Sequence, residues 1–320
     1  MLQKISKRAV LTCMVAAACA GHAAYPEKTI KLIVPFGAGT STDAMAREFG
    51  QALSGVLKQA VVVENKTGAE GTIGGQALIS APADGYTIML TSSSLTVLDP
   101  LIKKTLPYDP NKDFAPVCGV ARVGNVMNMS NTLPYKNIAE FMAAAKAQPG
   151  KFTFAYSSAT TRLAGELFSQ ASGIQMVSVP YRTSAMGLAD VAGGQVSLFF
   201  IDHLSATPFY QAGKIKPLLI GGPQRNKSLP EVPSAAEAGV PGYVIYPWFG
   251  VYLPAQTPPA IANQMREVMA QALKVPAMKA KIETSGMEEF PLCGDALGKY
   301  QVDEMNHWAQ VIKKAGIEKQ

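Results

Sequence analysis

The chain has 320 residues, 48% of them hydrophobic, which is enough to fill the core of one large domain or two medium ones. Its formal net charge is +6. Three basic residues lie in a predicted leader, so the predicted mature chain has 26 basic and 23 acidic residues, a net charge of +3. So mild a charge, without a basic stripe interleaved with aromatic residues, argues against nucleic acid as a partner.

The first residues have the pattern of a secretory signal peptide. Lys4, Lys7 and Arg8 precede an apolar run over 9–20, and small residues follow it. We predict a signal peptide over 1–23, with cleavage after Ala23. The apolar run is too short to stay in the bilayer as a permanent anchor. We therefore expect an exported protein.

Two of the four cysteines, Cys118 and Cys293, lie outside the predicted leader. In an exported protein they could form one disulfide, or they could stay as two buried thiols, because the sequence does not give their separation in space. Neither the cysteines nor the two remaining histidines have the spacing of metal ligands. We expect no metal site and no cofactor.

Strands and helices alternate from residue 29 onward. The apolar runs and loop signals predict strands over 29–36, 60–64 and 86–91, with helices over 42–58 and 71–80 between them. This β-α-β-α-β order is typical of a parallel, doubly wound sheet, in which ligands bind at the carboxyl ends of the strands. Two of these ends, 37–42 and 92–94, are small and polar.

The second half repeats this arrangement. A long apolar segment over 114–129 is expected to cross into another domain, and a second long strand over 244–253 is expected to return. Between them we predict helices over 138–147, 162–172 and 185–191, strands over 152–156, 177–180, 195–201 and 216–220, and a short helix over Ser234–Ala238. Helices over 259–273, 276–285 and 295–315 end the chain.

The predicted fold is therefore α/β, with two doubly wound sheets joined by two crossing strands and a ligand cleft between them. We place domain 1 at 24–123 plus 250–320 and domain 2 at 124–249. Small polar turns would face each other across the cleft, as in a hinged clamp.

A series of ordered motifs indicates a family. They include Tyr25-Pro26-Glu27-Lys28, Ile30–Thr42, Val61–Asn65, Leu106–Pro110, Leu163–Phe168 and Pro241-Gly242-Tyr243. From Tyr25 to its end the chain resembles the extracytoplasmic solute receptors of tripartite tricarboxylate transporters, the Bordetella uptake gene (Bug) family. The resemblance implies a two-lobed, type II-like periplasmic binding protein. It also implies hinge closure on a small carboxylate, delivery to a membrane permease, a periplasmic location, a monomer and no catalysis.

The resemblance also implies a ligand site at the first turn. In the family, backbone groups and ordered water hold one ligand carboxylate there, which carries over to Phe36, Gly37, Ala38, Gly39, Thr40 and Ser41. Neutral N–H groups and hydroxyls can satisfy a carboxylate without burying an unpaired charge. The chain has Gly37–Thr40 where the family usually has Ala-Pro-Gly-Gly, so the ligand need not be the commonest one.

Other candidate ligand residues come from neighbouring strand ends and from domain 2. They are Ser92, Ser93, Ser157, Ser158, Thr160, Arg162, Tyr181, Arg182 and Asp202. Either arginine could bind a second carboxylate bidentately, or could be a solvated residue at a helix start. Asp202 could accept from the ligand, or could pair with Arg182. Tyr181 could stack on an aromatic ligand, or could simply pack the hinge.

Two other features are interpreted as structural. Trp248 lies in the middle of a predicted strand, so packing is favoured over ligand stacking. Asp43 and Arg47 are four residues apart on the first helix and are interpreted as an ion pair beneath the turn.

Two classes of function stay open. One is a transport receptor, which could also present its ligand to a signalling partner or serve an ATP-driven importer, although the motif order fits the tripartite family better. The other is a secreted enzyme on the same scaffold, for which no nucleophile elbow and no complete phosphate or dinucleotide motif is present. Candidate ligands are tricarboxylates, linear dicarboxylates, aromatic carboxylates and amino acids. A shortened turn over 157–161, near Tyr181 and Arg182, favours a rigid or aromatic one.

Overall fold

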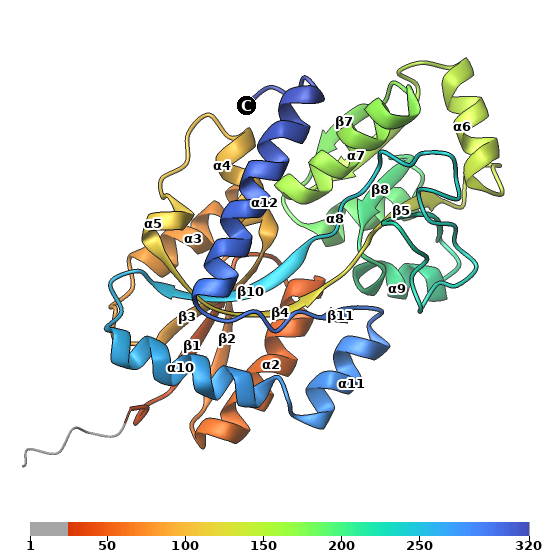
Figure 1. The fold of residues 1–320 in the computed structure, drawn as a ribbon. Coiled ribbons are helices and arrows are strands. Elements are labelled where there is room, and N and C mark those ends of the chain that lie inside the picture. Colours follow the sequence, from red (N-terminus) through yellow and green to blue (C-terminus); the bar gives the residue numbers. More distant parts are fainter. Residues whose placement is uncertain (1–24, 320) are drawn as a thin grey trace, which may run out of the picture.

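The structure is a computed structural model that describes residues 25–319. The predicted signal peptide lies outside the described residues. Two sheets, each flanked by helices, lie side by side and give the chain two lobes (Figure 1). We call the elements around the six-stranded sheet lobe 1 and those around the five-stranded sheet lobe 2. Within residues 25–319, no helix combines the length and apolar character that crossing a membrane requires.

The sheet of lobe 1 has the strand order β11-β4-β10-β3-β1-β2. Its strands are β1 (Ile30–Val34), β2 (Val61–Asn65), β3 (Thr87–Ser92), β4 (Phe114–Arg122), β10 (Trp248–Pro254) and β11 (Glu288–Glu289). β1 pairs in parallel with β2 and β3, as expected from the alternation of strands and helices. β10 runs antiparallel to β3 and β4, so the sheet is mixed because the returning chain enters it from the opposite direction.

Helices cover both faces of this sheet. One face carries α2 (Ser41–Leu57), α10 (Pro259–Ala272) and α11 (Pro276–Thr284), packed over a separate hydrophobic cluster. The other elements are η2 (Ala69–Gly71), α3 (Thr72–Ile79), η3 (Ser94–Leu98), α4 (Asp99–Ile102), α5 (Pro110–Asp113) and α12 (Asp295–Lys314). Of these, α3, η3 and α12 contact the sheet on its second face.

The sheet of lobe 2 has the order β7-β6-β8-β5-β9. Its strands are β5 (Asn125–Ser130), β6 (Thr153–Tyr156), β7 (Val177–Pro180), β8 (Leu198–Ile201) and β9 (Ile215–Gly221). The helices are α6 (Ile138–Ala147), α7 (Ala159–Ser172), α8 (Ser184–Ala192) and α9 (His203–Gln211). β6 is parallel to β7 and β8, whereas β5 is antiparallel to β8 and β9.

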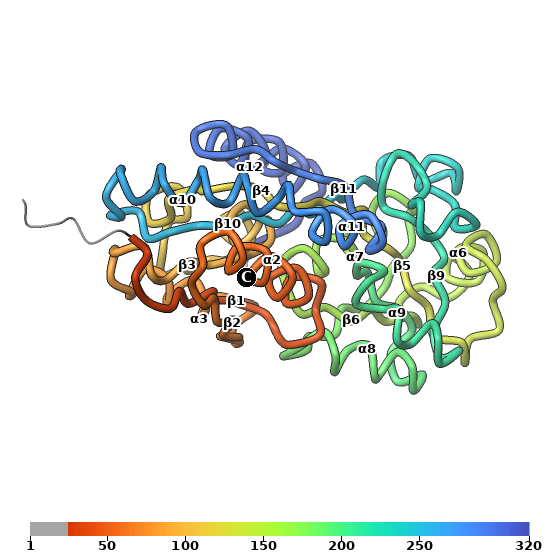
Figure 2. The backbone as a smooth tube through the Cα atoms, turned by 90° about the horizontal axis from the view of Figure 1, so that it is seen from below, coloured from red at the N-terminus to blue at the C-terminus, as the bar shows by residue number. Residues whose placement is uncertain are grey.

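Two extended segments connect the lobes and lie next to each other (Figures 1 and 2). The first runs from β4 into β5, and the second runs through 244–247 into β10. They are hydrogen bonded between the lobes, from Val123 N to Pro247 O at 3.0 Å and from Asn125 N to Ile245 O at 3.2 Å. The single strand predicted over 114–129 is therefore two strands in different sheets, separated at Val123-Gly124.

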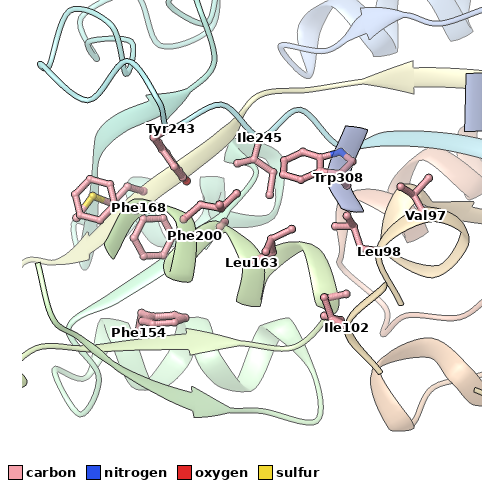
Figure 3. Close-up of a cluster of buried hydrophobic side chains, with 14 of the residues drawn as sticks. Val97, Leu98, Ile102, Phe154, Leu163, Phe168, Phe200, Tyr243, Ile245 and Trp308 are labelled. Carbon is pink, nitrogen blue, oxygen red and sulfur yellow. The ribbon is translucent and has the colours of Figure 1, made fainter. Parts of the chain in front are cut away.

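One hydrophobic cluster extends from lobe 2 into the second face of lobe 1. Figure 3 shows Leu163 of α7 lying between Phe200 of β8 on one side and Leu98 and Ile102 on the other. Trp308 of α12 belongs to the same cluster. The lobes therefore share apolar contacts beside the crossing segments.

Cys118 and Cys293 form a disulfide, which settles the alternative that the sequence left open. Other predicted elements also differ from the structure. The strand predicted over 244–253 begins at Trp248. Ser234–Ala238 is a turn, not a helix. The helix predicted from Arg162 begins at Ala159 because Ser158 and Thr161 form a capping box. Trp248 has the predicted packing role: it is fully buried and its ring packs on Phe290 and Tyr300.

Candidate functional site

A small cavity of about 60 Å³ lies between the lobes, and we call it the cleft. Hydroxyl-bearing side chains make up most of its wall. The lining residues are Phe36, Thr40, Ser41, Thr42, Ser92, Val123, Asn125, Ser157, Ser158, Thr160, Thr161, Ser184, Ile201, Asp202, Ser205, Pro247 and Phe249. Asp202 is the one charged side chain among them. This volume holds only a few water molecules, so a larger ligand requires the lobes to separate.

Four helices begin at the cleft or at its rim. The N-caps of α2, α7 and α9 are Thr40, Ser158 and Asp202, which line the cleft, and Ser184, the first residue of α8, lines it too. The N-terminus of a helix presents unpaired N–H groups and the positive end of its dipole. The convergence of several such ends favours an anion in the cleft.

The first turn is held by one carboxylate and one hydroxyl. Thr40 caps α2: its Oγ1 accepts from Asp43 N and donates to Gly37 O at 2.8 Å. The Asp43 carboxylate reaches back to accept from Gly39 N at 3.0 Å. Gly39 has φ of +81°, a conformation that glycine adopts at little cost.

The expected ion pair beneath this turn is present. Arg47 Nη2 lies 2.9 Å from Asp43 Oδ1, and Asn65 Nδ2 donates to the same oxygen at 2.9 Å. Burial alone would raise the pKa of Asp43, but the hydrogen bonds from Arg47, Asn65 and Gly39 outweigh it and hold that pKa below its usual value. Asp43 therefore shapes the turn from below and does not line the cleft.

The two lobes are in direct contact across the cleft. Ser41 Oγ donates to Asp202 Oδ2 at 2.8 Å, and Ser41 N donates to Ser205 Oγ at 3.1 Å. On another side, Thr160 N donates to Ser94 Oγ at 3.3 Å. These bonds show that the structure has a closed arrangement of the lobes.

Asp202 bonds to serines and not to Arg182. Besides Ser41, it accepts from Ser205 N at 2.9 Å and from Ser205 Oγ at 3.1 Å. The proposed pairing with Arg182 is therefore wrong. An aspartate at the N-cap of α9 is stabilised by the start of that helix, which explains how it is buried without a cation.

The predicted site residues divide into three groups. Phe36, Thr40, Ser41, Ser92, Ser157, Ser158, Thr160 and Asp202 line the cleft. Gly37 and Arg182 line a smaller adjoining recess, where Arg182 is exposed. The remaining five, Ala38, Gly39, Ser93, Arg162 and Tyr181, line neither.

The side chains of Ser93, Tyr181 and Arg162 have other surroundings. Ser93 Oγ accepts from Trp248 N at 3.4 Å, and the Tyr181 hydroxyl donates to Asp190 at 2.6 Å. Arg162 is buried near Tyr156 and Glu166. Burial raises the pKa of Tyr156 and of Glu166, and the positive charge of Arg162 offsets part of that rise.

Sequence reasoning missed several lining residues, among them Asn125, Ser184 and Ser205. Ser205 follows Asp202 by three residues, which is the spacing of an N-cap and the N3 position of a helix. That spacing could have indicated α9 and with it Ser205. Thr160 has a buried Oγ1 without a hydrogen-bond partner among the described residues, so the cleft contains a free hydroxyl.

Comparisons with known proteins agree with this architecture. The family model described as "Tripartite tricarboxylate transporter family receptor" matches residues 45–317. Protein BugT of Bordetella pertussis is 32% identical over 295 residues, covering 91% of this chain and 90% of BugT. The solved structure of R. palustris Rpa4515 with adipate is 32% identical with a TM-score of 0.88, covering 92% of this chain and all of that one. The periplasmic binding protein BugD is 30% identical with a TM-score of 0.87 over the same shares. The chain is thus a member of the tripartite tricarboxylate transporter receptor family, with the two-lobed fold of periplasmic binding proteins.

Proposed function

We propose that this protein is a periplasmic receptor that closes its lobes on a small carboxylate and delivers it to the membrane permease of a tripartite tricarboxylate transporter. The convergence of helix N-termini and hydroxyls on the cleft carries the proposal. These groups are hydrogen-bond donors for an anion. The related Rpa4515 structure, which was solved with adipate, supports the ligand class.

The moving bodies are proposed to be domain 1, over 24–123 plus 250–320, and domain 2, over 124–249. The ligand residues are proposed to be the predicted ones that line the cleft, with Gly37 and Arg182 at its rim. The carboxylate would replace the direct Ser41–Asp202 contact or bind beside it. No chemical step is proposed, so the ligand should be recovered unchanged.

Thermal unfolding with a panel of carboxylates tests the proposal. The panel is adipate, succinate, glutarate and citrate, with dimethyl adipate as the matched control that lacks the charges. A ligand at 100 times its dissociation constant should stabilise the fold by about 2.7 kcal/mol, a rise of several degrees in Tm. If no carboxylate raises Tm, and the denatured protein releases no carboxylate retained from expression, the proposed ligand class is wrong.

The variant Thr160→Val tests whether the carboxylate binds in the cleft. It removes the unpartnered hydroxyl at nearly constant volume, and we expect it to weaken binding of the best carboxylate about 3- to 10-fold. Thr91→Val is the matched control, because the Thr91 hydroxyl is also buried without a partner but does not line the cleft. Equal effects of the two variants would argue against this location.

Export is tested separately. The full chain, expressed in a Gram-negative host, should appear in the osmotic-shock fraction with the mass expected for cleavage after Ala23. The full-length mass in the cytoplasmic fraction would contradict the proposed location.

A further inference from the structure

A second and much larger cavity lies behind the crossing segments. Its volume is about 720 Å³, and we call it the back cavity. Val244, Tyr246 and Lys227 line it from the second crossing segment and lobe 2. Glu283, Met287 and Trp308 line it from lobe 1. The back cavity therefore spans both lobes, as the cleft does.

The crossing segments separate the two cavities. In the first segment, Val123 and Asn125 face the cleft, whereas Arg122 and Gly124 line the back cavity. In the second segment, Pro247 and Phe249 face the cleft, whereas Val244 and Tyr246 line the back cavity. Alternate residues of an extended chain point to opposite sides, so the same short segments form a wall of both cavities.

We propose that the residues of the back cavity set the affinity of the cleft by limiting how far the lobes open. The inference rests on the proposed receptor function. The crossing segments are the connection between the lobes and lie between the two cavities. A rotation about them that widens the cleft must narrow the space on the other side.

The closed arrangement is therefore the one in which the back cavity is widest. A group that fills the back cavity fits the closed lobes and obstructs the open ones. Since only the closed lobes surround a ligand, apparent affinity scales with the closed fraction of the empty protein.

The ion pair and the hydrogen bonds described for the back cavity do not have to break when such a group is added. Arg122 is paired with Glu288 at 2.9 Å, and Tyr246 donates to the same glutamate at 2.7 Å. At the rim, Asn226 Nδ2 of lobe 2 donates to Gly286 O of lobe 1 at 2.9 Å, so the lobes are in contact on this side as well. An added apolar side chain at an exposed lining position need not break any of these bonds.

Two filling variants with matched controls test the inference. Val244→Trp adds bulk from the crossing segment, and Val62→Trp is its control, since Val244 is 43% and Val62 47% exposed and Val62 lies on β2 away from both cavities. Glu283→Trp adds bulk from α11, with Glu267→Trp on α10 as its control. Both glutamates are exposed, and their side chains make no hydrogen bond within residues 25–319. Two independent positions keep the test decisive if one variant folds poorly.

The readout is the distance between the lobes in the ligand-free protein. Spin labels at Lys66→Cys and Met186→Cys, exposed residues of lobe 1 and lobe 2, report it by double electron–electron resonance. In the wild type we expect two populations, one with a long and one with a short distance between the labels. Adipate should increase the population with the short distance. Without ligand, both filling variants should raise the ratio of the short-distance population to the long-distance population at least about threefold. The control variants should leave this ratio unchanged.

A wild-type ratio in both filling variants, or a shift toward the long distance, would overturn the inference. A wild type that shows only the short distance with and without adipate would overturn it too, because the lobes would not open. Failure of adipate and the other carboxylates to bind would count against the proposed function alone, since the comparison uses ligand-free protein.

Discussion

Ser41 and Asp202 are 161 residues apart in the chain, yet the Ser41 hydroxyl donates to the Asp202 carboxylate across the cleft at 2.8 Å. Ser41 is the first residue of α2 in lobe 1, and Asp202 is the N-cap of α9 in lobe 2. The bond therefore joins two helix starts on opposite lobes. The same two side chains therefore contribute both to closure and to the polar wall of the cleft.

Ser41→Ala should weaken binding of the best carboxylate about 3- to 10-fold, the equivalent of about 1 kcal/mol for one hydrogen bond to a charged group. Isothermal titration calorimetry measures the change. Ser54→Ala is the control, because the Ser54 hydroxyl on the same helix donates to Gln59 O at 2.7 Å, away from the cleft. A similar loss in both variants would indicate a general effect on α2.

Asp43→Ala should lower the free energy of unfolding by about 3 kcal/mol, since the buried carboxylate accepts from Gly39, Arg47 and Asn65. Arg47→Met should cost less than about 1 kcal/mol, because the Arg47 side chain is 54% exposed and its ion pair is screened by water. Urea denaturation of the two variants gives both values. Equal costs would mean that the ion pair, and not the support of the turn, stabilises this region.

Arg182→Ala should change carboxylate affinity by less than about threefold. Arg182 is exposed at the rim recess, where an ionic contact gains little over water. Calorimetry with the best ligand decides. A loss of tenfold or more would restore the bidentate clamp that the sequence suggested.

His203 and Asp43 should each contribute one stage of stability loss in acid. Burial lowers the pKa of His203 below its ordinary value of 6.5, and the neighbouring Asp202 opposes the shift only in part. The neutral histidine therefore contributes stability that is present above pH 6.5 and is lost as pH falls through the folded-state pKa. Asp43, whose pKa is also lowered, adds a second loss below its ordinary value of 3.8.

Urea denaturation between pH 3 and 8 measures both stages. His203→Gln should remove the upper stage and leave the lower one, whereas His307→Gln, at an exposed position, should change neither. Persistence of the upper stage in His203→Gln would assign it to another group.

The strand and helix order could be predicted because apolar runs are bounded by glycine, proline and hydroxyl-rich turns. Even the bounds of α6 and β7 agree with the prediction. The helices over Ser94–Ile102 and His203–Gln211 were missed, since each contains a proline and has a short apolar pattern. Because α9 was not predicted, Ser205 could not be assigned to the ligand site from the sequence.

Pairings across the cleft depend on how two distant segments meet, which spacing along the chain does not encode. From the sequence, Asp202 was expected either to accept from the ligand or to pair with Arg182. The structure gives it serine hydroxyls and a helix start instead. Which residues of the crossing segments line the cleft and which line the back cavity likewise depends on how the two lobes pack, so the sequence alone could not predict it.

The Cys118–Cys293 disulfide joins β4 to the segment that leads into α12, and the covalent loop of 175 residues that it closes contains all of lobe 2. The disulfide thus links the two stretches of chain that form lobe 1, and it keeps them covalently joined even when lobe 2 is cut. A protease that cuts only within lobe 2 should leave two fragments that migrate as one species on a non-reducing gel and separate after reduction. Immediate separation without reductant would show that the bridge is not formed in the protein as isolated.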